Sequence, residues 1–522
     1  MDGPTTPDPD ATEVAEQVLG FDPARLREAL HGRSTPSGGL LAVGVAASPG
    51  AASGPVATSF DAALDAADRG ESPVLVLEET GPADEPAMRV AAAVVTVRGG
   101  LASHAAVVAR GWGLPAVCGV SVARIEDGAV RFGDVRVDDG EWVSVDGSSG
   151  ELRSGVGRHV AATGLDEELD ELLGWCDRLV GGRPQVWVNA DTPEEVRAGM
   201  ALGALGVGLC RTEHQFLGGD LGLLRTLLLG GRDAEQASAD LAEHQRAAVL
   251  ELLDAAAGVP VVVRLLDPPL HEFLPAPDDE RADPELRRLA GDWREHDPML
   301  GVRGVRLAVA APELVAAQVR GLLAALADRQ HAGIPSDLRL LVPMVSWPAE
   351  LELALDVVRS AAASASVPVP PVGVMVETPA AALGAHRLAA HAAFLSVGTN
   401  DLSQLTLGLG RDDTEARVVE AYRSRGMLAA SPFATLDDTV ADLVAGAVRR
   451  APDSSWGLCG EHAGDPVSLR RLAEVPFHSV SCSAYRVPVA RLELGRIAAA
   501  RLLGVQLDDV PLGGVPVAGG GD

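Results

Sequence analysis

Arginine and carboxylate residues recur directly after short apolar segments in the later part of the sequence. Arg211 follows VGLC, Arg264 follows PVVV, Glu377 follows VGVMV, and Asp401 lies three residues after LSVG. Each of these arginines on its own would be interpreted as a surface or ion-pair residue. Together, guanidinium groups that match phosphate oxygens and carboxylates that suit Mg²⁺ predict a site for an anionic, oxygen-rich substrate and a divalent cation.

A histidine nearer the amino terminus is placed for different chemistry. Arg98, Gly99 and Gly100 precede His104, which lies at the expected start of a helix near residues 105–112. Free backbone N–H groups and the helix dipole favour an anion at such a position. A phosphoryl group carried on the imidazole would be stabilised there. A helix-capping histidine is the alternative, and the spacing alone leaves it open.

The segments that precede the first group of residues predict a closed barrel. Beyond Pro184, eight short apolar strands alternate with helical segments, which fits a (β/α)8 barrel better than an open sheet. Catalytic groups of such barrels lie after the carboxyl ends of the strands, as these residues do. We expect strands at 186–190, 206–210, 259–265, 338–344, 372–377, 394–398, 456–460 and 479–483.

The remaining sequence predicts a smaller α/β domain that carries His104 and is joined to the barrel by a helix. The whole chain is therefore expected to be of the α/β class. The expected divisions are a helical leader over 1–38, the histidine domain over 39–155, a linker helix over 156–180, the barrel over 181–510 and a flexible tail over 511–522.

The composition excludes several classes of function. The 43 basic and 73 acidic residues give a formal charge of −30, which opposes nonspecific binding to nucleic acid or to an anionic membrane. The sequence contains no lysine, which excludes a Walker-type phosphate lysine and a lysine Schiff base. The five cysteines lack the paired spacing of a zinc site or disulfide framework. Without a signal sequence or long apolar run, we expect a cytoplasmic protein.

Longer motifs resemble those of the phosphoenolpyruvate-utilising enzymes, and most closely the pyruvate, phosphate dikinase branch. The segment GGLASHAAVVARGWGLPAVCG resembles the phosphohistidine signature of that family. RLLDPPLHEFLP, SVGTNDLSQLTLG, GLCGEHAGDP and VSCSAYRVPVARL resemble segments of its barrel. The resemblance spans residues 40–500 and implies a phosphohistidine swivelling domain followed by a (β/α)8 TIM-type barrel that binds phosphoenolpyruvate and pyruvate.

The resemblance also implies a role for each candidate residue. It identifies His104 as the phosphoryl carrier and Cys459 as the acid that protonates the pyruvate enolate, with Cys482 at the next strand end as the rival thiol. The remaining roles concern the substrate and the metal. Arg211, Arg264 and Arg303 would bind the phosphate of phosphoenolpyruvate, Thr399 and Asn400 would contact substrate, and Glu377 and Asp401 would hold Mg²⁺.

The function implied by the resemblance is transfer of a phosphoryl group between phosphoenolpyruvate and His104, with release or consumption of pyruvate. Full dikinases place an ATP-binding domain before the histidine domain, where this sequence has only residues 1–38. We therefore expect the ATP half-reaction to need a separate ATP-binding protein or another phosphoryl acceptor. The resemblance further implies a homodimer.

Three alternatives are considered. A noncatalytic phosphoenolpyruvate or pyruvate sensor would need neither the nucleophile His104 nor the acid Cys459. An enzyme I-like phosphocarrier kinase would be expected to carry a helical insertion in the histidine domain, and residues 40–155 show none. A barrel aldolase acting on a pyruvate enolate would explain the arginines and the metal ligands, but not the histidine domain.

Overall fold

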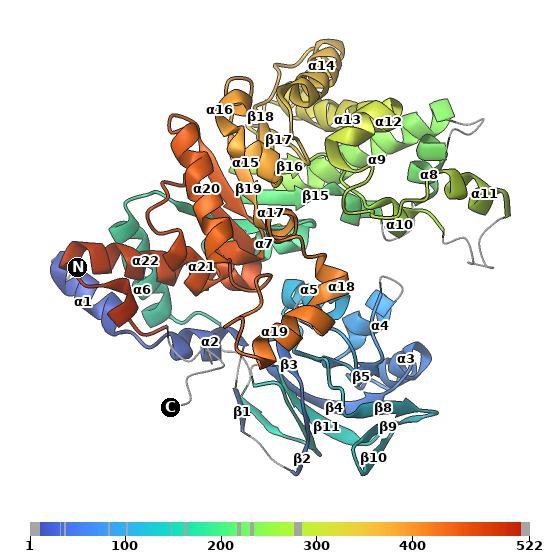
Figure 1. The fold of residues 1–522 in the computed structure, drawn as a ribbon, viewed down its shortest axis with the longest axis vertical. Coiled ribbons are helices and arrows are strands. Elements are labelled where there is room, and N and C mark those ends of the chain that lie inside the picture. Colours follow the sequence, from blue (N-terminus) through green and yellow to red (C-terminus); the bar gives the residue numbers. More distant parts are fainter. Residues whose placement is uncertain are drawn as a thin grey trace.

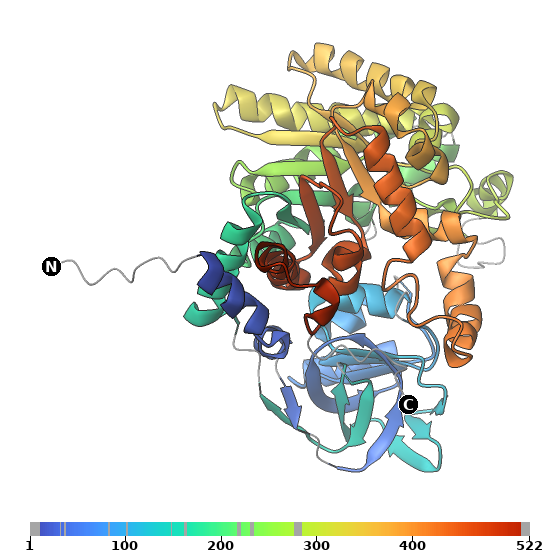
Figure 2. The same ribbon diagram turned by 60° about the vertical axis from the view of Figure 1, so that its left-hand side comes forward.

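The structure is a computed structural model, and it places a closed barrel beside a smaller α/β unit (Figures 1 and 2). The strands of the barrel run from green to red in Figure 1, and the smaller unit lies beneath them in blue, cyan and teal. The structure describes residues 11–31, 33–35, 38–81, 84–100, 103–147, 149–160, 164–216, 221–229, 234–275 and 284–512.

Eight parallel strands form the barrel, and each overlaps the range expected from the sequence. Every strand pairs with the next in the chain, and the last strand pairs with the first, which closes the barrel. The predicted fold class is therefore confirmed. The strands are β14 (Gln185–Asn189), β15 (Val207–Arg211), β16 (Pro260–Arg264), β17 (Asp337–Val342), β18 (Val372–Val376), β19 (Leu395–Gly398), β20 (Trp456–Cys459) and β21 (Ser479–Ser483).

Helices cover the outside of the barrel and bury the largest apolar core between themselves and the strands. Alternation along each strand sends one set of side chains outward to this core and the other set into the barrel. Within the described ranges no single helix is long and apolar enough to cross a membrane; one consecutive pair, Gly304–Ala310 and Pro312–His331, passes on length and composition but bends by 117°. The covering helices include α7 (Pro193–Ala201), α9 (Ala234–Ala255), α13 (Pro312–His331), α14 (Pro348–Ala365), α20 (Asp438–Arg450) and α22 (Val487–Leu503).

The smaller unit is built on an eight-stranded sheet with the order β2-β12-β11-β4-β5-β6-β7-β3. Its outer strands are β2 (Leu40–Val43), β12 (Glu151–Ser154), β11 (Trp142–Asp146) and β3 (Val45–Ser48). Its centre is a parallel set formed by β4 (Ala51–Ala57), β5 (Val74–Leu77), β6 (Ala93–Thr96) and β7 (Ala116–Cys118). The helix α5 (His104–Trp112) connects β6 to β7 and packs its alanines against this sheet. Its first residue is the predicted phosphoryl carrier.

Two helices that belong to neither the barrel nor the eight-stranded sheet pack together against the barrel. The helix α6 (Glu167–Val180) begins at an Asp166 cap, whose side chain accepts a hydrogen bond from the N–H of Leu169. It buries an apolar face against α22, the last helix of the barrel. The amino-terminal helix α1 (Ala11–Gly20) joins the same cluster. Of the leader expected over 1–38, the described residues form α1, α2 (Pro23–His31) and the short strand β1 (Arg33–Thr35), and the two helices pack on the barrel side.

The smaller unit contacts the barrel through the α5 side. The Tyr485 hydroxyl, just after β21, lies 3.4 Å from the carbonyl oxygen of Trp112 at the end of α5. Gly113 has φ +66°, and a Cβ there would lie 2.4 Å from the Tyr485 ring, so only glycine permits this approach. A Cβ on Gly100 would likewise lie 3.4 Å from the Glu415 side chain. Both barrel contacts come from segments that follow strand ends, so α5 faces the carboxyl-terminal mouth of the barrel.

Candidate active site

The carboxyl-terminal mouth brings most of the predicted site residues together. Arg211, Arg264 and Cys459 are the last residues of β15, β16 and β20. Glu377 directly follows β18, and residues 399–401 open α17 (Thr399–Leu407) after β19. Because all eight strands are parallel, these strand ends meet at one mouth.

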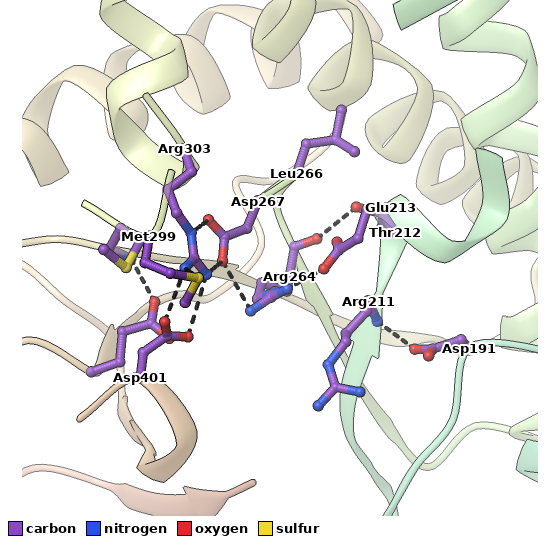
Figure 3. Close-up of polar contacts among 12 residues, drawn as sticks. Asp191, Arg211, Thr212, Glu213, Arg264, Leu266, Asp267, Met299, Arg303 and Asp401 are labelled. Atoms are coloured by element: carbon purple, nitrogen blue, oxygen red, sulfur yellow. Dashed lines mark hydrogen bonds and ion pairs between the residues drawn. The ribbon is translucent and has the colours of Figure 1, made fainter. Parts of the chain in front are cut away.

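Arg303 reaches the same mouth from a loop. It precedes the short 3₁₀ turn η3 (Gly304–Arg306), and the residue is 4% exposed. Its Nε and Nη2 donate to the two carboxylate oxygens of Asp267 at 2.8 and 2.5 Å. Its Nη1 and Nη2 donate to Asp401 at 2.9 and 3.3 Å (Figure 3). Arg303 therefore bridges the Asp267 carboxylate, which follows β16, and the Asp401 carboxylate, which follows β19.

Arg264 belongs to the same network. Its guanidinium pairs with the Glu213 carboxylate and, at 3.2 Å, with Asp267. Burial alone would lower the pKa of Arg264, but the charges of Glu213 and Asp267 raise it above its ordinary value. Arg264 and Arg303 are therefore fixed cations, held in place by carboxylates that leave little freedom to the side chains.

Arg211 differs from the other two arginines. Its backbone N–H donates to Asp191 Oδ1 at 2.6 Å, which fixes the main chain. Within the described ranges its guanidinium has no ion pair or hydrogen bond, and Figure 3 shows it extending away from the Arg303 network. Together with Arg486 it lines a cavity of about 80 Å³ at the mouth. Arg211 is thus the arginine that is open to a bound anion.

Glu377 and Asp401 supply two carboxylates near each other. Glu377 is 1% exposed, and its Oε1 accepts a hydrogen bond from the Met344 N–H at 2.6 Å. Burial, together with the charges of Asp401 and Asp267, raises the pKa of Glu377 to about 8. A divalent cation would remove this unfavourable concentration of negative charge. The described residues include no cluster of three or more His, Cys, Asp or Glu side chains that could hold a metal ion.

The Cys459 thiol faces the interior of the barrel, where it packs with Trp187, Leu209 and Met375. It accepts a hydrogen bond from the Ser396 hydroxyl at 3.5 Å and lies 3.3 Å from the Val397 carbonyl oxygen. Burial raises the pKa of the Cys459 thiol to about 11, so the thiol keeps its proton at neutral pH. A protonated thiol is suited to donate a proton rather than to act as a nucleophile.

Cys482 is placed less favourably for that role. It packs in the core between the strands and the surrounding helices, although it also borders the small cavity at the mouth. Burial raises its pKa to about 12. The geometry favours Cys459 over Cys482, because only Cys459 belongs to the cluster inside the barrel.

Thr399 and Asn400 use polar atoms to hold the neighbouring loop. The Thr399 hydroxyl donates to the Cys459 carbonyl oxygen at 3.2 Å. The Asn400 Oδ1 accepts a hydrogen bond from the Glu461 N–H at 3.2 Å. Thr399 is fully buried, so in this structure it positions the Cys459 loop, whereas the half-buried Asn400 lies at the mouth.

His104 begins α5, but its side chain lies outside the described part of the chain. The cap of this helix is Ser103, whose hydroxyl accepts from the Ala106 N–H at 3.4 Å and donates to the Gly100 carbonyl oxygen at 2.9 Å. Gly99 has φ +100°, and a Cβ there would lie 2.8 Å from Ser103 Cβ, so the turn requires glycine. Because Ser103 caps the helix, the capping role considered for His104 is already filled.

Asp267 and Glu213 pair with the site arginines, although no role was predicted for them from the sequence. Asp267 lies three residues after Arg264, and Glu213 two residues after Arg211, so both carboxylates follow the same strand ends as the arginines. That proximity was the available signal.

His462 is also buried at the mouth, with Nε2 3.0 Å from the Pro432 carbonyl oxygen, and burial lowers its pKa to about 4. We interpret it as a neutral structural residue.

Comparisons with known proteins agree with this arrangement. Residues 178–499 match the family described as PEP-utilising enzyme, PEP-binding domain, and residues 70–150 match PEP-utilising enzyme, mobile domain. Pyruvate, phosphate dikinase 1 (chloroplastic) of Arabidopsis thaliana is 38% identical over 92% of this chain and 52% of its own length. Pyruvate, phosphate dikinase of Rhizobium meliloti (strain 1021) is 38% identical over 91% of this chain and 56% of its own length.

The chain thus spans about half the length of the curated relatives it matches. A solved HpcH/HpaI aldolase/citrate lyase family protein from Burkholderia cenocepacia covers 59% of this chain and 92% of its own, but at 15% identity and a TM-score of 0.30 it carries no weight. The match to the PEP-binding domain extends over more than half of the 522 residues. The chain therefore belongs to the phosphoenolpyruvate-utilising enzymes.

Proposed function

We propose that this chain transfers a phosphoryl group reversibly between phosphoenolpyruvate and His104, with pyruvate as the other product. The observation that carries the proposal is the seating of α5, which begins at His104, against the barrel mouth that holds Arg211, Arg264 and Arg303. The mouth offers cations for the phosphate and carboxylate of the substrate, and the small unit brings the nucleophile.

The arginines divide the work of binding. Arg264 and Arg303 are held by buried carboxylates, so they present fixed positive charge without reorganisation. The Arg211 guanidinium is unengaged within the described residues and is the first partner for an incoming phosphate. Arg303 also holds Asp401, so substrate binding that draws on either residue must loosen that pair.

The transfer itself requires one nucleophile and one acid. An imidazole nitrogen of His104 attacks phosphorus, the P–O bond to the enol oxygen breaks, and the electron pair leaves with the enolate of pyruvate. The Cys459 thiol donates its proton to the methylene carbon, which gives pyruvate and a thiolate that regains a proton from water. The reverse reaction runs through the same groups with the proton moving back to sulfur.

We further propose that Glu377 and Asp401 hold Mg²⁺. A bound Mg²⁺ would supply positive charge that stabilises the enolate oxygen of pyruvate. Around it, Met344 fixes Glu377 by its N–H, and Arg303 orients Asp401. A Cβ on Gly398 would lie 2.9 Å from Glu377 Oε2, so glycine at that position keeps space for the carboxylate.

The second half of the reaction needs a phosphoryl acceptor or donor. We propose that it is a separate ATP-binding protein, because this sequence has no lysine and no recognisable Gly-rich phosphate loop. The purified 522-residue chain should then show no pyruvate- and phosphate-dependent ATP consumption until such a protein is added. ATP consumption by the chain alone would contradict this part of the proposal.

We also propose that the chain forms a homodimer.

The central test is labelling with ³²P-phosphoenolpyruvate and Mg²⁺, followed by detection of acid-labile label on the protein. The wild-type chain should be labelled, and His104→Ala should not be. His386→Ala, which removes an exposed histidine of α16 (Ala385–Ala389), is the matched control and should label normally. Labelling that persists in His104→Ala would overturn the assignment of the carrier.

A further inference from the structure

The amino-terminal half of the barrel interior is unusually open on one side. The inward positions there are Ser396 on β19, Gly457 on β20, and Ser479 and Ser481 on β21, with Gly208 on β15. Such barrels are ordinarily filled by layers of bulky branched side chains. Here the small side chains leave a cavity of about 360 Å³, a volume within the range of small-molecule sites.

The cavity opens at the end of the barrel opposite to the arginine-rich mouth. Arg183, Phe394, Ser455 and His478 all precede the strands they lead into, and all line it. The apolar part of its wall comes from Trp187 and Phe394 together with Val262 and Leu458, and the polar part from serine hydroxyls. The lining is therefore suited to a ligand with a short carbon skeleton and several polar groups.

The charge at this rim is positive, although the chain as a whole carries −30. The lining residues include Arg183, Arg339 and His478 and no Asp or Glu. Arg339 is held by Asp337, to which it donates at 2.8 and 2.6 Å, so it adds little net charge. Arg183 is exposed and has no ion pair within the described ranges. Its guanidinium is the group left to attract an anion.

His478 adds a directed donor. Its Nδ1 accepts the Trp456 N–H at 3.1 Å, so the neutral ring carries its hydrogen on Nε2. Arg183 and His478 both line the cavity. Burial, and after it the positive charge of Arg183, lowers the pKa of His478, which favours the neutral ring. A carboxylate at the rim would meet one guanidinium and one N–H donor.

We propose that this cavity is a second ligand site, which binds a small polar carboxylate with its charge at Arg183 and His478 and its skeleton between Trp187 and the serine hydroxyls. This site is separate from the phosphoenolpyruvate site, and its occupation does not depend on the function proposed above. It has the features of a ligand pocket: a preformed concave shape, an apolar wall and few convergent polar groups.

Occupation of the cavity has one consequence for the opposite mouth. Ser396 lines the cavity, and its hydroxyl donates to the Cys459 sulfur at 3.5 Å. A ligand that accepts this hydroxyl hydrogen would withdraw it from the thiol, which makes Cys459 a weaker acid. Given the proposed function, a bound carboxylate should slow proton exchange at the pyruvate methyl group.

Isothermal titration calorimetry of the full chain without added Mg²⁺ tests the binding. The probes are tartrate and succinate, with glycerol as the neutral comparison and inorganic phosphate as the rival anion. At least one dicarboxylate should bind with a stoichiometry of one and glycerol should not. Arg183→Ala should weaken that binding at least tenfold.

A second variant narrows the cavity directly. Gly457→Ala places a methyl group 3.3 Å from the Ser479 hydroxyl and 3.4 Å from the Ser396 hydroxyl, and should weaken binding several-fold. Arg124→Ala, which removes an exposed arginine of β8 (Ala123–Glu126), and Arg211→Ala at the opposite mouth should leave it unchanged. Failure of both dicarboxylates to bind, binding of phosphate alone, or loss in Arg211→Ala rather than Arg183→Ala would overturn the proposal.

Discussion

The two ends of the barrel use opposite means to make room for a ligand. At the carboxyl-terminal mouth, buried arginines and carboxylates hold one another, whereas the Arg211 guanidinium has no ion pair among the described residues. At the amino-terminal end, inward-facing glycine and serine residues leave a cavity, and the positive charge of Arg183 lies at its rim. Burying charged side chains at the carboxyl-terminal mouth fixes their positions for chemistry, but their desolvation costs much free energy. Small side chains at the amino-terminal end leave volume for a ligand and cost little free energy. The difference can be tested by removing matched groups from each end.

The largest expected effect concerns the thiol between the two ends. Cys459→Ala should reduce proton exchange at the pyruvate methyl group by about 10²–10⁴-fold, because the variant lacks the acid that protonates the enolate. Deuterium incorporation followed by NMR measures this rate. Cys482→Ala is the control and should retain exchange. Loss of exchange only in Cys482→Ala would reverse the assignment.

A comparable effect, on stability, is expected for Asp267. Asp267→Ala would leave Arg303 and Arg264 without a shared buried partner, which should lower the free energy of unfolding by about 3–5 kcal/mol. At the other end, Asp337→Ala removes the partner of the part-exposed Arg339 and should cost about 1 kcal/mol or less. Urea denaturation compares the two. Equal losses of unfolding free energy in the two variants would show that the buried ion pairs at the mouth contribute no more to stability than an ordinary surface ion pair.

The carboxylates proposed to hold Mg²⁺ form a third test. Glu377→Gln and Asp401→Asn should each weaken Mg²⁺-dependent phosphoenolpyruvate binding at least tenfold while the chain stays folded. Calorimetry with and without Mg²⁺ measures this. Glu350→Gln, in the first turn of α14 outside the barrel, is the control. Unchanged Mg²⁺ dependence in both site variants would remove these residues from the metal site.

The fourth test is the pH dependence of stability, where the effect builds up gradually over a range of pH. Burial lowers the pKa of His462 to about 4, so the unfolded chain binds a proton there between about pH 6.5 and 4 that the folded chain does not. Stability is therefore retained above pH 6.5 and lost as the pH falls, by roughly 3 kcal/mol from this group below pH 4. His462→Gln should reduce that slope more than His478→Gln at the other end, because His478 is less buried. An unchanged slope in His462→Gln would show that the ring is already protonated.

The sequence predicted the barrel well because its strands are short, valine-rich and regularly separated by helical segments. Arg211, Arg264 and Glu377 could be found for the same reason, since each follows such a segment directly. Arg303 required the family resemblance, because it lies on a loop. Its pairs with Asp267 and Asp401 join residues 36 and 98 positions apart, and no local pattern encodes such distances.

The amino-terminal cavity could not be predicted in the same way. Serine and glycine within a strand weaken the pattern without showing which face they occupy, so their inward position is visible only once the barrel closes. The sheet of the smaller unit is a similar case. Its edge strand β3 (Val45–Ser48) pairs antiparallel with β7, about seventy residues later, and such long-range pairing depends on tertiary packing.

The contact between Tyr485 and the end of α5 also makes movement of the smaller unit accessible to spectroscopy. The sequence contains only two tyrosines, Tyr422 and Tyr485, and the second lies against Trp112 and Gly113. Replacement of tyrosine by a fluorinated analogue would thus give two ¹⁹F resonances, one of them from the seam where the histidine-bearing unit rests on the barrel. Each departure of that unit from the barrel would change the Tyr485 signal, so the rate of the movement could be measured at the native residue itself.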